Sequence, residues 1–175
     1  MTISTWQANL TTHSGFQFNV RPASASDKAA LTLFFTKVTP EDLRFRFLSG
    51  MRSVGQSQIA AMIDIDHDKT ENFLAFVDDG AEIIATAMLA CDDKLETGEV
   101  AIVIRPEYKA RGVSWDLLHY VTRYAEAKGL KTIESIEQRG NHAAIDMEHQ
   151  MGFTSTPYPD DSSLVLVQRK LGAVG

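Results

Sequence analysis

The pattern of apolar and polar positions predicts one strand and three helical stretches in the first third of the chain. Residues 16–21 alternate apolar and polar side chains, which is typical of a half-buried strand. Ser26-Asp27 then provides an N-cap for a helix that runs to about Lys37. Thr39-Pro40, followed by two acidic residues, favours a second helix start, and a third helical stretch covers residues 56–63.

After residue 70 the chain alternates between short apolar runs and two longer amphipathic stretches. The amphipathic stretches predict helices at 113–128 and 141–151, and Asp78-Asp79-Gly80 predicts a hairpin turn. The order β-α-α-β-β-β-α-β-α-β-β indicates a mixed sheet covered by helices. The third and fourth of the strands that follow residue 70 should be parallel, because a helix crosses over between them. The apolar runs predict strands at 72–77, 82–90, 99–104, 132–137 and 163–169, with a further β region that opens at Phe153.

Composition narrows the class of protein without indicating an activity. The chain has 175 residues, 44% of them hydrophobic, which suits one globular domain. We place that domain at 16–171, after a polar lead-in (1–15) in which Trp6 is the candidate anchor, and before a short tail (172–175). The formal net charge of -6 argues against a nucleic-acid partner. A single cysteine, and a sequence without a signal peptide or a membrane-length apolar stretch, predict a cytoplasmic protein without a membrane partner.

The segment from Ile102 to Leu118 carries the clearest chemical signal. An apolar strand runs into a short loop that holds Lys109, Arg111 and Gly112 and opens directly into a helix. Unpaired backbone N–H groups at a helix start, together with the helix dipole and two cations, form a site for an anion. An ordinary strand–turn–helix with solvated cations would show the same residues, so the pattern alone leaves both interpretations open.

This segment resembles the acyl-CoA motif of the GNAT superfamily of acyltransferases, V-x-P-x-x-[QR]-G-x-G-x-[GA]. Ile104 and Pro106 match the V-x-P, and Lys109 stands at the Gln/Arg position. Gly112 is the central glycine, whereas Ala110 replaces the first glycine and Ser114 the last small residue.

Two further motifs resemble the same superfamily and follow its order along the chain. Residues 141–153 are similar to the family's N-x-x-A-x-x-L-Y-x-x-x-G-F helix, and Val20-Arg21-Pro22 is similar to its opening strand. Segments 39–47 and 98–104 are similar, more loosely, to the acetyltransferase domain of Pat-type protein lysine acetyltransferases. The resemblance implies an α/β (α+β) fold: a mixed, mostly antiparallel sheet of about six to seven strands flanked by helices.

The resemblance also implies acetyl-CoA as the acyl donor. The strand before the loop would pair with the pantetheine arm, and the main-chain N–H groups of the loop would hold the pyrophosphate. At Asn141 a helix N-cap is an alternative interpretation, and the two roles are compatible. The implied cofactor-binding residues are Ile102, Val103, Ile104, Lys109, Ala110, Arg111, Gly112, Val113, Ser114 and Asn141.

The implied reaction is direct attack on the thioester, within a ternary complex, by a primary amine of a protein lysine or a small molecule. The amine must first lose a proton, which calls for a carboxylate or a water relay. The Pat-like resemblance places the catalytic carboxylate at Glu99, with Glu134 and Glu137 in reserve, although Glu99 also fits a charged strand edge. A backbone N–H around Val103 or Ile104 would stabilise the charge that develops on the thioester oxygen.

Glu148 stands where the family commonly has a tyrosine that protonates the leaving thiolate. A glutamate there repels a thiolate unless burial raises its pKa, and it is otherwise a polar helix position. This departure and the altered glycine loop motivate an alternative function, a catalytically inactive acyl-CoA-binding regulatory domain. A CoA-independent interaction module on the same scaffold is a third hypothesis.

The sequence predicts no metal site. Residues 64–68 resemble the start of a calcium-binding loop, but the glycine and glutamate that such a loop requires further on are replaced by Lys69 and Ala75. A solvated acidic loop is the better interpretation. A homodimer is compatible with the family resemblance, although no interface is evident in the sequence.

Overall fold

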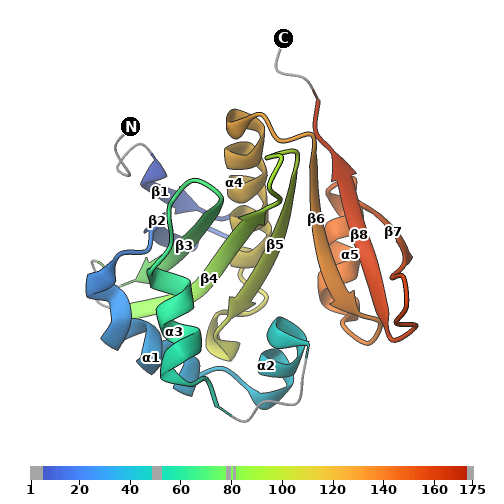
Figure 1. Ribbon diagram of the computed structural model, residues 1–175. Coiled ribbons are helices and arrows are strands. Elements are labelled where there is room, and N and C mark those ends of the chain that lie inside the picture. The colour runs from blue at the N-terminus through green and yellow to red at the C-terminus, as the bar shows by residue number, and fades with distance from the viewer. Residues whose placement is uncertain (1–5, 49–52, 78–79, 81, 173–175) are drawn as a thin grey trace.

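The computed structural model describes residues 6–48, 53–77, 80 and 82–172, and Figure 1 shows their arrangement. One mixed sheet forms the centre of the molecule, with helices on both of its faces. The elements in chain order are β1 (Ala8–Thr11), β2 (Gln17–Pro22), α1 (Lys28–Thr36), α2 (Pro40–Phe47), α3 (Gln56–Ile63), β3 (Thr70–Val77), β4 (Glu82–Cys91), β5 (Thr97–Ile104), α4 (Val113–Lys128), β6 (Thr132–Gln138), α5 (His142–Gln150), β7 (Thr154–Pro157) and β8 (Leu164–Lys170).

The described strands form an eight-stranded sheet in the order β1-β2-β3-β4-β5-β6-β8-β7. β5 and β6 are parallel neighbours, and the other adjacent strands pair antiparallel. The prediction of a mixed, mostly antiparallel α/β sheet is therefore confirmed. The parallel pair arises because α4 carries the chain from the end of β5 back to the start of β6.

The sheet separates two hydrophobic cores, and alternate side chains of β3 point into one core or the other. Phe73 and Ala75 pack in the core under α4, whereas Leu74 and Phe76 pack in the core under α1 and α3. Figure 1 shows α1 and α3 on one side of the sheet and α4 on the other. Because both faces of β3 are covered, the strand is buried along nearly its whole length, and its residues 73–77 are all apolar.

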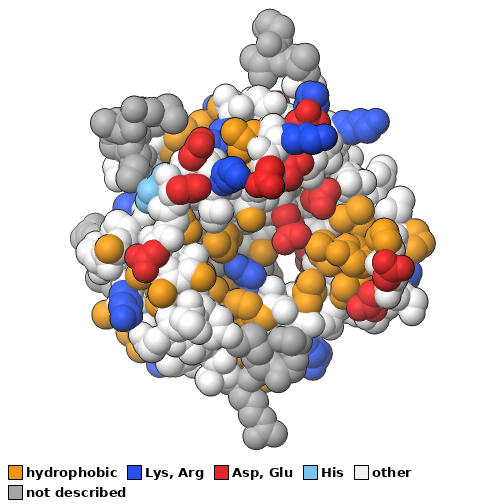
Figure 2. Space-filling model, viewed as in Figure 1, with side chains coloured by type: hydrophobic (Ala, Val, Ile, Leu, Met, Phe, Trp, Pro, Cys, Tyr) orange, Lys and Arg blue, Asp and Glu red, His pale blue; other side chains and the backbone are white. Residues whose placement is uncertain are grey.

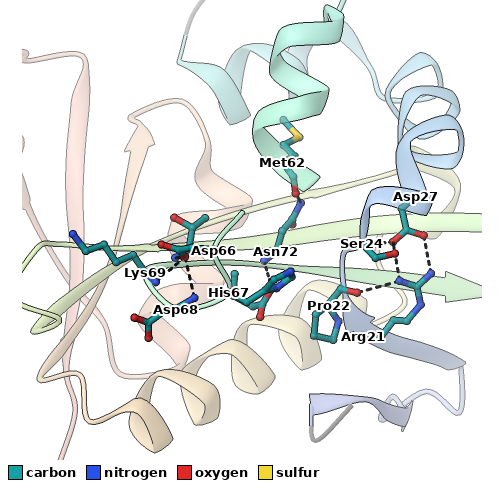
Figure 3. Close-up of polar contacts among 12 residues, drawn as sticks. Arg21, Pro22, Ser24, Asp27, Met62, Asp66, His67, Asp68, Lys69 and Asn72 are labelled. Carbon is teal, nitrogen blue, oxygen red and sulfur yellow. Dashed lines mark hydrogen bonds and ion pairs between the residues drawn. The ribbon is translucent and has the colours of Figure 1, made fainter. Parts of the chain in front are cut away.

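Polar contacts join helices α1 and α3 to the strands beside them (Figure 3). The guanidinium of Arg21 on β2 donates two hydrogen bonds, of 2.8 and 2.7 Å, to the carboxylate of Asp27 just before α1. The side-chain amide of Asn72 on β3 donates to the carbonyl of Met62 on α3 at 3.0 Å. These contacts tie each helix to a neighbouring strand.

The segment 64–68 is a solvated acidic loop, as predicted. Asp64, Asp66 and Asp68 are exposed. One carboxylate oxygen of Asp66 accepts the backbone N–H groups of Asp68, Lys69 and Thr70 at 2.9 to 3.1 Å (Figure 3). This carboxylate therefore closes a turn that leads into β3.

The prediction of a polar lead-in over residues 1–15 misses strand β1, and the predicted count of six to seven strands is too low. β1 pairs antiparallel with β2, from Ala8 opposite Val20 to Thr11 opposite Gln17. Its four residues are alternately half-buried and exposed, because a short edge strand covers little of the core. Its sequence therefore lacks the strong apolar alternation of the inner strands.

Trp6 is confirmed as an anchor for the start of the described chain. Its ring contacts Tyr120 and Tyr124 of α4 edge-to-face, with ring centroids 5.7 and 5.0 Å apart. The hydroxyl of Tyr120 also donates to the Trp6 carbonyl. These contacts hold the segment before β1 against α4.

The remaining elements match the predictions within two or three residues, with one difference in order. The predicted order has two helices between its first and second strands. The structure has three α-helices between the corresponding strands, β2 and β3, and the third of them, α3, is the helical stretch predicted at residues 56–63. Residues 78 and 79 of the predicted hairpin turn, and residues 173–175 of the predicted tail, lie outside the described residues. Within the described ranges, no helix has the length and apolar character needed to cross a bilayer.

We expect the substitution Trp6→Ala to lower the free energy of unfolding by about 2–3 kcal/mol, because it removes a half-buried ring and its aromatic contacts. Urea denaturation followed by circular dichroism measures the change. Leu33→Ala is the control, since Leu33 is 57% exposed on α1 and its loss should change stability by no more than about 0.5 kcal/mol. Equal effects of the two substitutions would show that β1 is not anchored as described.

Candidate active site

The candidate active site lies where β5 and β6 diverge. The two strands pair at three positions only: Thr97 opposite Thr132, Gly98 opposite Ile133 and Glu99 opposite Glu134. Beyond that point both strands continue, and among the described residues they have no further pairing with each other. The divergence opens a cavity of about 360 Å³ that is lined on one side by residues 100–104 and on the other by residues 135–137. Figure 2 shows a hollow between the two halves of the sheet.

The diverging strands leave backbone hydrogen-bonding groups facing the cavity. In a sheet interior the N–H and C=O groups along both edges of a strand are paired with its neighbours. β5 is paired with β4 along its whole length, from Gly98 opposite Cys91 to Ile104 opposite Ala85. On its other edge, the stretch that follows Glu99 has no strand partner in the described part of the chain. This edge can hydrogen-bond an extended ligand that carries amide groups.

The N-terminus of α4 forms the second part of the cavity wall. Gly112 is the N-cap residue of α4. Its φ of 88° lies in the left-handed region that favours glycine. The first helical bond runs from the N–H of Asp116 to the carbonyl of Gly112 at 3.1 Å. The N–H groups of Val113, Ser114 and Trp115 therefore have no partner within the helix, which makes this end suitable for an anion.

The two cations of the preceding loop are held by the protein and do not point freely toward the helix start. The ammonium of Lys109 pairs with the carboxylate of Asp42 on α2. The guanidinium of Arg111 lies over the rings of Phe16 and Tyr108, 5.3 and 5.5 Å from their centroids. Backbone N–H groups, more than free cations, thus define the anion-binding character of the loop.

Most residues that the sequence predicts for the cofactor site meet at this cavity. Asn141 also lines it, from the start of α5. Asn141 occupies the N-cap position of α5, as the alternative interpretation has it, but its side chain makes no capping hydrogen bond and donates instead to Glu137 at 3.1 Å. Arg111 is not among the lining residues, because its side chain packs on two aromatic rings. The predicted residues that do line the cavity are Ile102, Val103, Ile104, Lys109, Ala110, Gly112, Val113, Ser114, Asn141 and Glu148.

Glu99, the predicted base, lies at the point where β5 and β6 separate and is not itself part of the cavity lining. Its pKa is raised by partial loss of hydration and by the negative charge of Glu134 opposite it, while the positive charge of Arg46 acts in the other direction. Arg46 reaches the cavity from α2. A carboxylate with a raised pKa at the point where the strands separate is a better proton acceptor than an ordinary surface glutamate.

Arg46 is the main wall residue that the sequence patterns did not reveal. Its guanidinium donates to the sulfur of Met88 at 3.5 Å, and its Nε is buried without a partner among the described residues. Burial lowers the pKa of the guanidinium, and the charge of Glu99 partly opposes that effect. In the sequence Arg46 stands between Phe45 and Phe47 on a short helix, where an arginine usually points to solvent.

A second pair of carboxyl groups lies on the wall formed by β6 and α5. Glu148 is 3% exposed and accepts a hydrogen bond from the hydroxyl of Ser135. Its pKa is raised by burial and by the negative charge of Glu137. Burial likewise raises the pKa of Glu137, and hydrogen bonds from Ser135 and Asn141 oppose the rise. The sequence predicts neither this pairing nor the part of Ser135, because both depend on how α5 packs on β6.

Comparison with known proteins decides the family. Residues 40–153 match the family model described as the acetyltransferase (GNAT) family. The chain belongs to the GNAT acetyltransferase family. The GNAT resemblance seen in the sequence is thereby confirmed, and acyl-CoA-dependent acetyl transfer is the general activity of this chain.

Individual relatives agree with this GNAT assignment. Acetyltransferase PA5475 of Pseudomonas aeruginosa is 25% identical over 149 residues, which cover 84% of this chain and 80% of that protein. The GNAT domain of S. lividans PAT is 20% identical, covers 98% of this chain and 100% of that one, and superposes with a TM-score of 0.89. PaiA N-acetyltransferase of Thermoplasma acidophilum, solved in complex with coenzyme A, is 16% identical with a TM-score of 0.71 and covers 89% and 100% of the two chains. The structural likenesses show the same fold.

We expect the stability of the protein to depend on the proton of Glu148. A carboxyl whose pKa is raised on folding binds its proton more tightly in the folded than in the unfolded chain. The free energy of unfolding therefore falls as the pH rises from the ordinary glutamate pKa of 4.5 to the raised one, by up to about 1.4 kcal/mol per pH unit. Glu148→Gln removes this titrating group and should flatten the curve, as measured by urea unfolding at a series of pH values.

Asp146→Asn is the matched control for this measurement. Asp146 is exposed on the same helix, and the substitution also exchanges a carboxyl for an amide. We expect it to leave the slope unchanged. If Glu148→Gln kept the wild-type slope, the carboxyl of Glu148 would not be the group whose pKa is raised.

Proposed function

We propose that the protein is an N-acetyltransferase that transfers an acetyl group from acetyl-CoA to a primary amine by direct attack within a ternary complex. The observation that carries the proposal is the cavity between β5 and β6, which joins an unpaired strand edge to the N-terminus of α4. One wall offers amide-binding groups, the start of α4 offers an anion site, and Glu99 lies where the two strands separate, directly before the cavity-lining Val100. These features fit the three parts of an acyl-CoA-dependent transfer.

The residues present fit acetyl-CoA. The backbone of residues 102–104 would pair with the amide-containing pantetheine arm, and the main chain of residues 109–114 would hold the pyrophosphate. Gly112 matters because a Cβ on it would lie 3.1 Å from the Cβ of Thr12, so a larger residue would push the loop out of place. Asn141 would contact the donor from α5, and Arg111 would contribute through its main chain. Acetyl-CoA supplies the thioester carbon that the amine attacks.

Glu99 and the edge of β5 would carry the transfer itself. Glu99 takes a proton from the amine, directly or through a water molecule, and so makes the nitrogen lone pair available. An N–H group around Val103 or Ile104 would stabilise the negative charge that develops on the thioester oxygen. The raised pKa of Glu99 suits this role, because a base is most effective when its pKa lies nearer the working pH.

The acceptor class is a primary amine of a protein lysine or a small molecule. The carboxyl groups of Glu99 and Glu134, opposite each other where β5 and β6 separate, favour a cationic acceptor over an anionic one. The likeness to the GNAT domain of S. lividans PAT, which is 20% identical, supports testing a protein lysine alongside small amines. Two alternatives, an inactive acyl-CoA-binding regulatory domain and a CoA-independent interaction module, remain as outcomes of the measurements below.

We expect Gly112→Glu to weaken binding of acetyl-CoA by at least about 100-fold, or about 2.7 kcal/mol, in calorimetric titration. The new side chain would stand at the anion site and bring a negative charge toward the pyrophosphate. Gly129→Glu is the matched control, because Gly129 has φ of 86° at the other end of α4 and open space around it. Saturable binding of acetyl-CoA to the wild type and to Gly129→Glu, but not to Gly112→Glu, supports a donor site at the start of α4. If the wild type does not bind acetyl-CoA, the CoA-independent interaction module is the hypothesis that survives.

We expect Glu99→Gln to lower kcat by about 10²–10⁴-fold while the KM for acetyl-CoA stays within about twofold. Thiol release from acetyl-CoA in the presence of a panel of amines and lysine peptides measures both quantities. Glu41→Gln is the control, because Glu41 is an exposed acid on α2. Binding without turnover in the wild type would favour the regulatory domain, and undiminished turnover in Glu99→Gln would remove Glu99 from the mechanism.

A further inference from the structure

The opening between β5 and β6 has two sides, because the side chains of a strand alternate between the two faces of the sheet. On β5, Val100 and Ile104 belong to the core under α4, whereas Val103 belongs to the core under α1 and α3. By the same alternation Glu99 lies on the face of Val103, and Glu134 of β6 is opposite it. The two acids therefore lie on the face of the sheet that α4 does not cover.

Helix α2 lies over the opening on this second face. It packs next to β5, and the carbonyl of its Arg44 accepts a hydrogen bond from the side-chain amide of Gln138 on β6 at 3.4 Å. Figure 1 shows α2 between the two strands. Phe45 and Arg46 of α2 line the cavity together with Ile136 of β6. We call these three residues the acceptor side of the cavity.

Arg46 carries a positive charge that no carboxylate neutralises at close range. Within the described ranges it forms no ion pair at 4.0 Å or less. Its guanidinium donates to the sulfur of Met88 at 3.5 Å and lies over the ring of Phe47, 4.9 Å from the centroid. A thioether is a weak acceptor and a ring carries no net charge, so these contacts leave the cation without a counter-ion. Lys109, the other cation that lines the cavity in the described part of the chain, is paired with Asp42.

The guanidinium and the two acids are placed to bind the two ends of one small molecule. Met88, which the guanidinium contacts, is opposite Ala101 on β5, two residues after Glu99. Residues two apart on a strand share a face and lie about 6.6 Å apart. In an α-amino acid the nitrogen and the carboxylate carbon are about 2.5 Å apart, and a hydrogen bond at each end adds about 3 Å. Such a molecule reaches both groups, whereas a lysine within a peptide has no carboxylate beside its amine.

The geometry points to an α-amino acid with an apolar side chain as the acceptor, and to Arg46 as the residue that binds its carboxylate. This inference rests on the proposed acetyl transfer and narrows its acceptor class. The amine lies at Glu99, the carboxylate accepts hydrogen bonds from Arg46, and the side chain packs on Phe45 and Ile136. The nitrogen gains the acetyl group and loses its proton to Glu99, and the electron pair of the C–S bond leaves with coenzyme A. The products are an N-acetyl amino acid and coenzyme A.

Turnover of matched acids and amides tests the inference, with acetyl-CoA as the donor and detection of the released thiol. Leucine, methionine and phenylalanine are each compared with their own amide, which keeps the amine and the side chain but lacks the carboxylate. For the best of these acids we expect kcat/KM to exceed that of its amide by about 10–100-fold, the value of a hydrogen-bonded charge. Arg46→Gln should remove this preference, and Arg46→Lys should restore part of it.

Arg44→Gln is the matched control, because Arg44 is an exposed arginine on the same helix. We expect it to keep the preference of the wild type for the acid. If the wild type used the amide or a lysine peptide as well as the acid, the inference would be overturned while the acetyl transfer stood. An equal loss of activity toward acid and amide in Arg46→Gln would likewise show that Arg46 does not bind a carboxylate.

Binding of the product gives a readout that does not depend on turnover. In calorimetric titration, with and without coenzyme A, N-acetylleucine should bind the wild type about 10–100-fold more tightly than N-acetylleucinamide. Arg46→Gln should lose the difference, and circular dichroism checks that this variant is folded. Equal binding of the two ligands by the wild type, or binding of neither, contradicts the inference. Titration of the same samples with acetyl-CoA tests the proposed function separately, since failure of that function would abolish donor binding in all of them.

Discussion

The incomplete pairing of β5 with β6 is the constraint on which the rest of the site depends. The two parallel strands pair at three positions and then separate. Beyond that point, the backbone N–H and C=O groups along the facing edge of each strand are not paired with the other strand. The cost of exposing backbone groups is tolerable because β5 is held by β4 and β6 by β8 along their whole lengths. The crossover helix α4 begins beside the same opening. Strand edge and helix end therefore face one cavity.

The electrostatics of the cavity follow from this arrangement. An acidic protein with a formal net charge of -6 needs a local site for an anion, and the helix start supplies it with backbone dipoles. The loop cations hold the loop in place: Lys109 ties it to α2, and Arg111 ties it to Phe16 and Tyr108. Carboxyl groups with raised pKa values lie on the cavity wall formed by β6 and α5, and at the point where β5 and β6 separate. A donor that is anionic at one end and releases a thiolate at the other fits this polarity.

The sequence predicted correctly those elements whose bounds are set by residues within or next to them. The bounds of α4, 113–128, were predicted correctly because glycines in the left-handed conformation stand at both of its ends. The parallel pair was predicted because a crossover helix requires it. Strand β1 escaped prediction, since four residues at a sheet edge need little apolar alternation. Trp6 gave the hint, as a large aromatic residue in an otherwise polar segment.

The parts of the site that escaped prediction depend on packing between distant segments. The position of the Arg111 side chain is decided by Phe16, almost a hundred residues earlier, and no local pattern contains that contact. Glu148 was predicted as a site residue by resemblance, but its pairing with Glu137 follows from how α5 lies on β6. Arg46 reached the cavity because α2 packs next to β5. Motifs thus indicated most of the residues that line the cavity, and tertiary contacts decide which charged groups lie beside them.

Hydrogen exchange of the backbone amides, with and without acetyl-CoA, tests the central claim most directly. If the diverging strand edge and the helix start bind the donor, amides of residues 102–104 and 113–115 should exchange more slowly when acetyl-CoA is added. Amides of β8, which are paired with β6 and β7 already, should not change. Protection confined to other parts of the chain, or none at saturating acetyl-CoA, would contradict the account.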